Sequence, residues 1–188
     1  MIKETINGHE LIFKSHPSLF SPKHIDKGTL HMLSFVNFEK NFKVLDLGCG
    51  YGVVGIFAAK YCDPSKVFLV DINKDALSIL QTNIYLNNVK GVNVILSNAY
   101  ENLNEKDFDI ILSNPPYHTD FSVAKTFIEK GFNRLRIGGR FFMVTKRSNW
   151  YKNKFVSIFG GVKIHSIDGY YVFEAEKRGE KYAKSRNN

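Results

Sequence analysis

Short runs of consecutive apolar residues alternate along the chain with longer segments in which apolar residues recur every three or four positions. The runs are rich in Val, Ile, Leu and Phe, as expected of strands buried on both faces of a sheet. The longer segments carry one apolar face, as expected of amphipathic helices. Strands are predicted at 42–47, 66–71, 92–96, 108–112 and 140–145, and helices at 52–61, 75–86, 121–135 and 149–159.

Strands and helices in this order predict an α/β fold, because crossover helices place parallel strands side by side. A Gly138-Gly139 pair is expected to turn the chain into the strand at 140–145. The last two predicted strands, 162–167 and 170–175, flank Asp168-Gly169, a two-residue hairpin signal. The sequence therefore predicts a Rossmann-like, mostly parallel seven-stranded sheet with helices on both faces and an antiparallel C-terminal hairpin.

The first 40 residues precede this core. A turn at Asn7-Gly8, a strand at 10–14 and a helix at 24–38 are predicted there. In a sheet of this kind, ligands bind at the carboxyl ends of the strands, where the strand order reverses. The chemistry is therefore expected just after Leu47, Asp71, Leu96 and Ser113.

A glycine-rich loop follows the first core strand and reads VLDLGCGYG from residue 44. Gly48, Gly50 and Gly52 allow positive φ and let the backbone approach a ligand closely. Asp46, two residues before the first glycine, is placed to meet a cationic ligand group, and Asp71 can accept hydrogen bonds from ribose hydroxyls.

Two other interpretations of the loop remain open. Gly50-x-Gly52-x-x-Gly55, with Asp71 about 20 residues later, also matches the dinucleotide fingerprint of NAD-dependent dehydrogenases. That fingerprint requires neither Asp46 nor Gly48. The glycines can also serve only as a tight turn.

A rigid polar corner is predicted where the fourth core strand ends, at Asn114-Pro115-Pro116-Tyr117. The prolines fix φ, and a residue that precedes proline is held extended. The Asn114 side-chain oxygen and the Pro115 carbonyl can then accept both hydrogens of one incoming amino group. Two such acceptors favour a pyramidal nitrogen whose lone pair points toward an electrophile. Tyr117 would stack on a flat substrate; a proline turn with a capping asparagine is the alternative.

VLDLGCGYG followed by SNPPY resembles the class I S-adenosylmethionine-dependent methyltransferases that methylate amino groups. Upstream, Phe20-Ser21 followed by Asp26-x-Gly28-Thr29 is similar to the catalytic half of the small-subunit ribosomal RNA guanine-N2 methyltransferases. Tyr117-His118 fits the aromatic residue and histidine that follow NPP in that family.

The resemblance implies a role for each matching residue. S-adenosylmethionine would be the cofactor, and Asn114, Pro115 and Tyr117 would hold the target base. Phe20 and Ser21 would close over the site, and His118 would contact the substrate. The cofactor would be bound by Asp46, Gly48, Gly50, Gly52, Asp71, Ile72, Asn98 and Asn114.

An excess of basic residues suggests the class of partner. Lys and Arg total 26 against 18 Asp and Glu, which gives a net charge of +8 and a pI of about 9.4. From Arg134 onward, 13 basic residues face only four acidic ones. Such a region favours polyanions, so RNA is the expected partner, with Lys146 and Arg147 on its phosphates. A basic protein that is merely soluble is the alternative.

Length and composition exclude several other classes of protein. The chain of 188 residues suits one domain, and 44% hydrophobic and 23% charged residues are globular values. It has neither an apolar run of about 18 residues nor a secretory signal at its start. Cys49 and Cys62 form no disulfide framework, and His16, His24 and His31 have no metal-ligand partners at useful spacing. A cytoplasmic protein without metal is expected.

Residues 1–188 are therefore interpreted as one methyltransferase domain. Residues 1–40 would cover substrate and cofactor, 41–177 would form the catalytic core, and 178–188 would be a basic tail that frays at its end. Three other activities remain possible. They are methylation of a protein glutamine, methylation of adenine N6, and RNA binding during assembly without catalysis.

Overall fold

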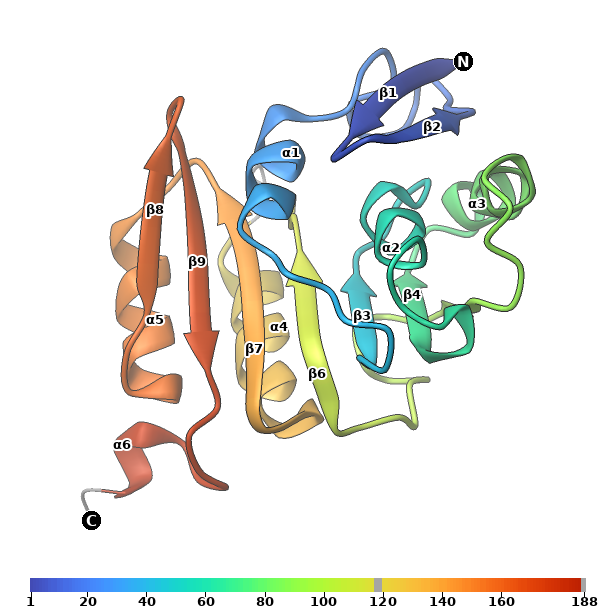
Figure 1. Cartoon of the computed structure of the whole chain (residues 1–188). Helices are drawn as coiled ribbons and strands as arrows, with labels where there is room; N and C mark the ends of the chain where they lie inside the picture. Colours follow the sequence, from blue (N-terminus) through green and yellow to red (C-terminus); the bar gives the residue numbers. More distant parts are fainter. Residues whose placement is uncertain (117–119, 187–188) are drawn as a thin grey trace.

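The predicted sheet is confirmed in the computed structural model, which describes residues 1–116 and 120–186. Seven strands pair in the order β5-β4-β3-β6-β7-β9-β8 (Figure 1). The first five in this order are parallel, and β9 is antiparallel to both of its neighbours. The strands are β3 (Val44–Leu47), β4 (Val67–Asp71), β5 (Asn93–Leu96), β6 (Phe108–Ser113), β7 (Leu135–Thr145), β8 (Lys163–Ile167) and β9 (Tyr170–Glu176).

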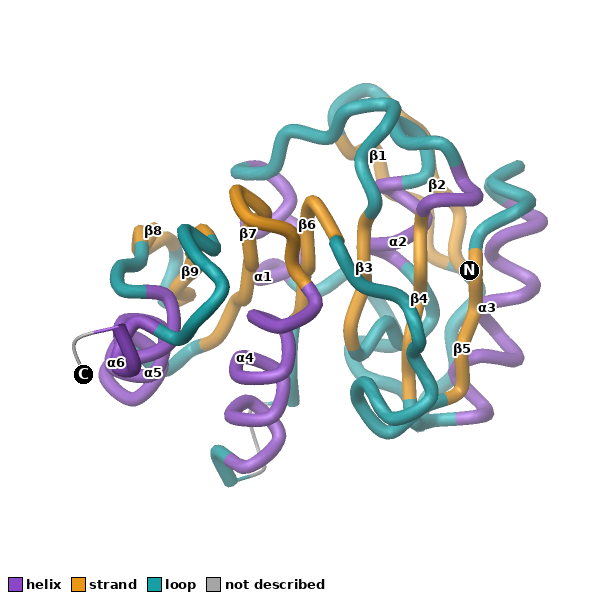
Figure 2. The backbone as a smooth tube through the Cα atoms, turned by 90° about the horizontal axis from the view of Figure 1, so that it is seen from below, coloured by secondary structure: helices purple, strands orange, loops and turns teal. Residues whose placement is uncertain are grey.

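Helices cover both faces of this sheet, as Figures 1 and 2 show. Successive strand residues point to opposite faces, so Val44 joins one apolar core and Leu45 the other. A separate hairpin of β1 (Ile2–Ile6) and β2 (His9–Phe13) joins the first core. The first core is completed by α1 (Lys27–Ser34), α2 (Val53–Ala58) and α3 (Lys74–Leu86), and the second by α4 (Ser122–Arg134) and α5 (Asn149–Phe159). A 3-10 turn at Pro64–Lys66 and α6 (Ala183–Arg186) complete the described elements.

Two buried asparagines, Asn83 on α3 and Asn87 at its C-cap, attach the N-terminal hairpin to the core. The Asn87 side chain accepts the backbone N–H of Ile12 at 3.0 Å and donates to its carbonyl at 2.7 Å. Asn83 does the same for Lys14, at 2.7 and 2.9 Å, and also donates to the carbonyl of Tyr51 at 2.8 Å. The two amides therefore pair with the end of β2 as a neighbouring strand would.

Several predicted boundaries were wrong. The predicted helix 24–38 spans only Lys27–Ser34, because the Asp26 side chain caps it by accepting from the Thr29 N–H. Leu135, predicted in a helix, begins β7. That strand runs through Gly138-Gly139 instead of starting after it, and a register shift opposite Phe108/Ile110 absorbs the irregularity.

Lys177, the last residue of the predicted core, is buried. Its ammonium group donates to the Leu135 carbonyl at 2.9 Å and lies over the Phe132 ring. Its backbone pairs with Gly138 and Gly139 beside β7. Lys177 therefore belongs to the core, and Tyr182 beyond it still packs on Phe132 and donates to the Glu129 carbonyl.

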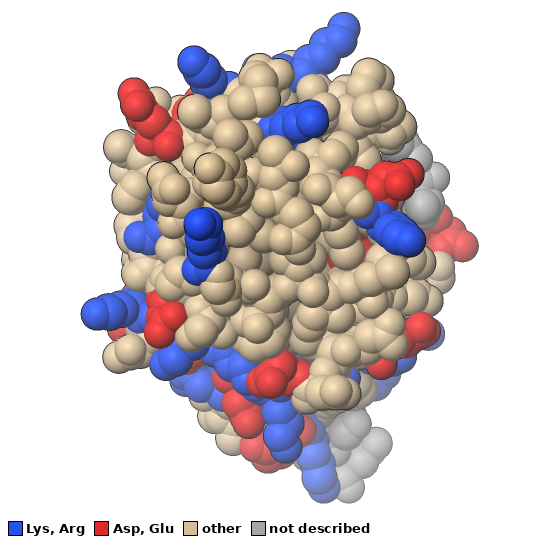
Figure 3. Space-filling view, turned by 90° about the vertical axis from the view of Figure 1, so that its right-hand side faces the viewer, with Lys and Arg blue, Asp and Glu red and all other residues tan. Residues whose placement is uncertain are grey.

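The basic excess after Arg134 is partly used inside the fold. Arg134 donates to the backbone carbonyls of Leu103 and Glu105, and other basic side chains of this region pair with carboxylates. Those pairs are Arg136 with Asp109, Arg140 with Glu174, and Lys154 with Glu129. The charge available to a polyanion is therefore smaller than the count suggested. Figure 3 views the right-hand side of Figure 1, where uncharged residues cover most of the surface and charged ones gather at its lower end.

Among the described residues, no helix has the length and apolar character needed to cross a membrane.

Replacing Asn83 with Leu is expected to destabilise the fold. The substitution keeps the side-chain volume but removes the two hydrogen bonds with the Lys14 backbone and the one donated to the Tyr51 carbonyl. We expect the free energy of unfolding to fall by about 2–3 kcal/mol, measured by urea denaturation. Ser78→Ala, on the exposed side of the same helix, is the control. Equal stability of the two variants would contradict the attachment of the hairpin by Asn83.

Candidate functional site

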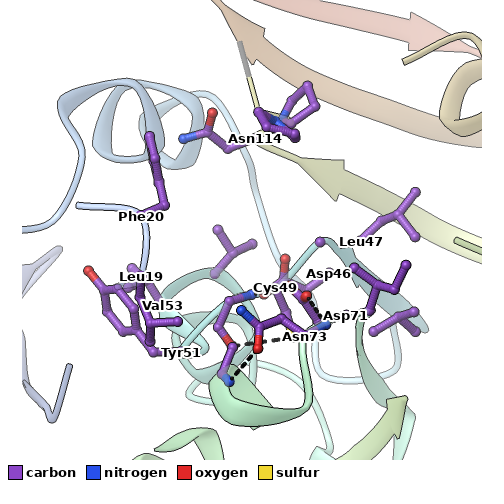
Figure 4. A pocket seen from close by; sticks show the side chains of 18 of the residues that line it. Leu19, Phe20, Asp46, Leu47, Cys49, Tyr51, Val53, Asp71, Asn73 and Asn114 are labelled. Atoms are coloured by element: carbon purple, nitrogen blue, oxygen red, sulfur yellow. Dashed lines mark hydrogen bonds between the residues drawn. The ribbon is translucent and has the colours of Figure 1, made fainter. Parts of the chain in front are cut away.

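The ends of β3, β4, β5 and β6 meet around one cavity of about 430 Å³. It lies where the strand order reverses, as the sequence predicted. The cavity is lined by residues that follow each of these strands, and by residues 18–21 and α1 from the N-terminal segment. In Figure 4, Phe20 and Asn114 lie across the cavity from Asp46 and Asp71.

The glycine loop wraps tightly around the end of β4. The N–H groups of Gly48 and Cys49 donate to the Val70 carbonyl at 2.8 and 3.0 Å, and that of Gly50 donates to the Asp71 carboxylate at 2.7 Å. Gly48 and Gly50 have φ of +74° and +54°, which favours glycine at both positions. At Gly48 and Gly50 the loop therefore presents backbone, without side chains, to the cavity.

Gly52 does not line the cavity, contrary to its predicted contact with the cofactor. It caps α2 with a φ of +102°, and a Cβ there would lie 2.2 Å from Leu80 Cδ1. Gly55 is similar, because its Cβ would lie 2.3 Å from Leu69 Cδ2. These two glycines allow α2 to pack closely, whereas Gly48 and Gly50 line the cavity.

Asp46 is a carboxyl group buried at the base of the cavity. Only 2% of it is exposed, and it accepts the Gly55 N–H at 2.8 Å. Burial raises its pKa to about 7, nearby Asp71 adds to the increase, and the hydrogen bond from Gly55 opposes it. A cation placed beside this carboxyl would favour the ionised form. The site thus suits a ligand with an ammonium group.

The residues predicted to hold a nucleoside lie along the neighbouring strand ends. Asp71 accepts from Gly50 and from the Asn73 N–H, and its carboxylate retains lone pairs for ribose hydroxyls. Ile72 is 67% exposed at the cavity, as an apolar surface for a flat ring would be. Asn98 also lines the cavity; its amide nitrogen donates to Glu101, so its oxygen is the atom suited to accept from a ligand amino group.

Asn114 and Pro115 form the cavity wall at the end of β6. Just before them, the Ser113 hydroxyl donates to the Leu47 carbonyl at 2.9 Å, which ties this corner to β3. The Asn114 amide nitrogen donates to Asp26 and to Thr29, at 3.1 and 2.8 Å. Tyr117 and His118, also predicted at the site, lie outside the described residues.

Phe20 and Ser21 reach the cavity from the N-terminal segment. Phe20 is 53% exposed and Ser21 adopts a φ of +49°. The Ser21 carbonyl accepts from the Tyr51 hydroxyl at 3.2 Å, and its own hydroxyl donates to the His24 carbonyl at 2.6 Å. The segment is therefore held to the glycine loop through Tyr51.

Lys146 and Arg147 lie outside the cavity lining, just after β7. The Lys146 ammonium lies 5.1 Å from the centre of the Tyr170 ring, and the Arg147 guanidinium lies 5.6 Å from that of Phe121. Both side chains are exposed, so they can meet a ligand that extends beyond the cavity.

Sequence reasoning assigned no site role to Asp26, Thr29 or Tyr51, which all line the cavity. Asp26 and Thr29 belong to the Asp26-x-Gly28-Thr29 motif, which indicated the family but not the role of these residues in the site. Tyr51 had no such signal, because its contact with Ser21 depends on the path of the N-terminal segment.

The profile of the methyltransferase small domain family matches residues 10–174. The chain belongs to this family. The resemblance to S-adenosylmethionine-dependent methyltransferases drawn from the two motifs is thereby confirmed.

The relatives described below are between 26% and 37% identical to this chain. Ribosomal RNA small subunit methyltransferase C of Psychromonas ingrahamii is 37% identical over 85% of this chain and 46% of its own length. The protein of the same name from Serratia proteamaculans is 31% identical, with 92% and 50% covered. The chain thus spans about half the length of these relatives. The uncharacterized protein YbxB of Bacillus subtilis is 26% identical, with 92% and 89% covered.

Solved structures share this fold. The Thermus thermophilus 16S rRNA N2 G1207 methyltransferase RsmC, solved with AdoMet and guanosine, has a TM-score of 0.86 and 30% identity. The match covers 94% of this chain and 50% of that one. A methyltransferase from Pyrococcus furiosus, at 20% identity and a TM-score of 0.72, shares the fold over 90% of both chains.

No group of three or more potential metal-ligating side chains occurs in the described part of the chain. Cys49 and Cys62 are free and buried.

The Asp46 carboxyl is expected to make stability depend on pH. Its pKa in the folded protein, about 7, exceeds the ordinary value of 3.8, so the folded state holds a proton that the unfolded state loses. The contribution is full below about pH 4 and is lost as pH rises to about 7. Asp46→Asn keeps an acceptor for Gly55 and has no charge to bury. The stability of the variant relative to the wild type should therefore increase by roughly 3–4 kcal/mol between pH 4 and pH 8 in urea titrations. A difference that does not change with pH would refute the raised pKa.

Proposed function

We propose that this chain is an S-adenosylmethionine-dependent N-methyltransferase that acts on guanine N2 in small-subunit ribosomal RNA. One observation carries the proposal: a buried carboxyl group and the Asn114-Pro115 corner line the same cavity at the point where the strand order reverses. A methyltransferase of amino groups needs both, one for a cationic cofactor and one for the accepting nitrogen. The Thermus relative, solved with AdoMet and guanosine, supports this choice of ligands.

The cavity residues fit the proposed cofactor. Asp46 would bind its methionine end, with the Gly48 and Gly50 backbone alongside. Asp71 would bind the ribose, and Ile72 and Asn98 would contact the adenine. The bound cofactor supplies an electrophilic methyl group on a sulfonium, so the protein mainly has to align the accepting nitrogen.

The corner at Asn114 would orient the accepting nitrogen. The lone pair of an exocyclic amino group is delocalised into the ring, which makes it a poor nucleophile. If the Asn114 oxygen and the Pro115 carbonyl each accept one N–H, the nitrogen is held pyramidal with its lone pair toward the methyl group. Tyr117 would stack on the base, and His118 would contact it. The target base would have to leave its stack or come from a single-stranded segment.

Binding of RNA would extend beyond the cavity. Phe20 and Ser21 would close over the base, and the exposed side chains of Lys146 and Arg147 would contact phosphates. Residues 1–40 would then act as the cover, 41–177 as the catalytic core and 178–188 as a basic tail. We propose a cytoplasmic enzyme that needs neither a metal nor a membrane.

Methyl transfer from labelled S-adenosylmethionine tests the proposal directly. Ribosomal RNA, assembled small subunits, total protein and DNA are offered in parallel, and labelled nucleosides are identified by chromatography. The label is expected in N2-methylguanosine. Label in protein alone would favour glutamine methylation, label in adenine would favour an N6 enzyme, and no transfer to any substrate would favour a binding protein; each would reject the guanine assignment.

Asn114→Ala should separate catalysis from cofactor binding. Because the substitution removes one acceptor from the proposed nitrogen site, turnover is expected to fall by about 100-fold or more. The affinity for adenosylhomocysteine, measured by calorimetry, should change less than about threefold. An equal loss of turnover and affinity would show that Asn114 serves the cofactor instead.

A further inference from the structure

Asp26 is the centre of a hydrogen-bond cluster that ends on Asn114. The Asn114 amide nitrogen donates to Asp26 Oδ2 at 3.1 Å and to the Thr29 hydroxyl at 2.8 Å. The same Asp26 oxygen accepts the Thr29 backbone N–H at 3.2 Å, and Oδ1 accepts from the Tyr170 hydroxyl at 3.3 Å. Residues separated by as many as 144 positions in sequence therefore converge on one carboxylate.

Each defined position of the Asp26-x-Gly28-Thr29 motif has its own part in this cluster. Asp26 caps α1 and receives the Asn114 amide. Gly28 makes room for Tyr170, because a Cβ there would lie 2.7 Å from that ring. Thr29 is buried and accepts the second hydrogen bond of Asn114. The motif thus builds a surface of acceptors against the end of β6.

The carboxylate dictates which way the Asn114 amide faces. An ionised carboxylate can only accept hydrogen bonds, so a flipped amide would place its oxygen against the oxygens of Asp26. The amide oxygen therefore lies on the other side of the group from Asp26 and Thr29. Hydrogen bonds donated by the nitrogen also polarise the amide and make its oxygen a stronger acceptor.

The hydroxyl groups around Asp26 stay protonated in this environment. Burial first, and the charge of Asp26 second, raise the pKa of Tyr51 to about 12. The same two causes, in the same order, raise the pKa of Tyr170, which therefore remains a donor to Asp26.

We propose that Asp26 is a positioning residue for methyl transfer, with Thr29 in support. It fixes the Asn114 amide with its oxygen turned away from Asp26, as the acceptor for the substrate amino group, and it strengthens that oxygen as the attacking nitrogen gains positive charge. The inference rests on the proposed function for the identity of the substrate group, but the orientation of the amide is a property of the protein alone.

Asp26→Asn tests this role with little change in shape, because Asn also caps helices. Oδ2 of Asp26 accepts from both the Thr29 N–H and the Asn114 amide. In the variant either the oxygen or the nitrogen can take that place, so the side chain no longer dictates which end of the Asn114 amide faces it. The kcat is expected to fall by about 10-fold or more, with KM for the cofactor and the affinity for adenosylhomocysteine within about twofold of wild type. A wild-type kcat in this variant would overturn the proposal.

A reciprocal exchange gives the sharper test. Asn114→Asp places a second carboxylate against Asp26, where the two repel, and activity is expected to be lost. Adding Asp26→Asn allows the amide nitrogen at position 26 to take the place of Oδ2 and donate to the new carboxylate, with loss of the bond from the Thr29 N–H, so the double variant should recover at least about 10-fold over Asn114→Asp alone. A residue that only caps α1 would not produce this rescue, and a double variant no better than Asn114→Asp overturns the proposal.

Asp168→Asn is the matched control. The Asp168 carboxylate lies 3.2 Å from Nε2 of His31 in α1, is 70% exposed, and lies in the turn next to Tyr170. Its removal is expected to leave kcat unchanged. A loss equal to that of Asp26→Asn would show that removing any carboxylate near α1 lowers kcat, which would contradict a specific role for Asp26.

The side-chain amide resonances of Asn114 separate this inference from the proposed function. In ¹⁵N-labelled protein they should shift in Asp26→Asn and stay in place in Asp168→Asn, whichever substrate the enzyme methylates. If the wild type transfers nothing to RNA but the amide signals behave in this way, only the proposed function fails. If the amide signals do not shift in Asp26→Asn, the positioning role fails.

Discussion

The pairing register of β3 with β6 is the constraint on which the site depends. Asp46 lies opposite Leu112 in this parallel pair, so Asn114 lies two residues further along the adjacent strand. Two residues of strand span about 6.6 Å, and adjacent strands are about 4.8 Å apart. A carboxyl group and a polar corner are thereby held a small-molecule width apart. The hydrogen bond from Ser113 to Leu47 fixes the same register at the strand ends.

The N-terminal segment completes the site through specific polar contacts with the core. Asn83 joins Lys14 to the glycine loop at Tyr51, and Tyr51 in turn holds Ser21. Further along, α1 presents Asp26 and Thr29 to Asn114. The N-terminal segment contributes only a hairpin and one short helix. Through these contacts it nevertheless reaches both the glycine loop and the Asn114 amide.

Much of this arrangement could be predicted from sequence because it follows from local pattern. The apolar runs predicted the strands, and parallel topology then placed Asp46, Asp71 and Asn114 at one edge of the sheet. Chemistry that depends on contacts between distant segments could not be predicted in this way. Gly52 has the spacing of a ligand-binding glycine, yet its role is set by the Leu80 side chain from another helix.

The count of basic residues overstated the charge available to a partner for a similar reason. Lys177 was counted with the basic residues that favour a polyanion, but the start of β7 supplies a buried carbonyl for its ammonium group. The three ion pairs of β7 and α5 likewise join residues far apart in sequence. A net charge therefore indicates the class of partner better than it indicates the binding residues.

In the proposed reaction, an amino group and a bound sulfonium meet between Asp46 and the Asn114-Pro115 corner. A crystal structure of the protein with adenosylhomocysteine and guanosine would test this geometry. We expect the thioether sulfur above Gly48 and Gly50, with guanine N2 within hydrogen-bond distance of both the Asn114 side-chain oxygen and the Pro115 carbonyl. A guanine amino group bound elsewhere, or a sulfur atom turned away from that corner, would contradict it.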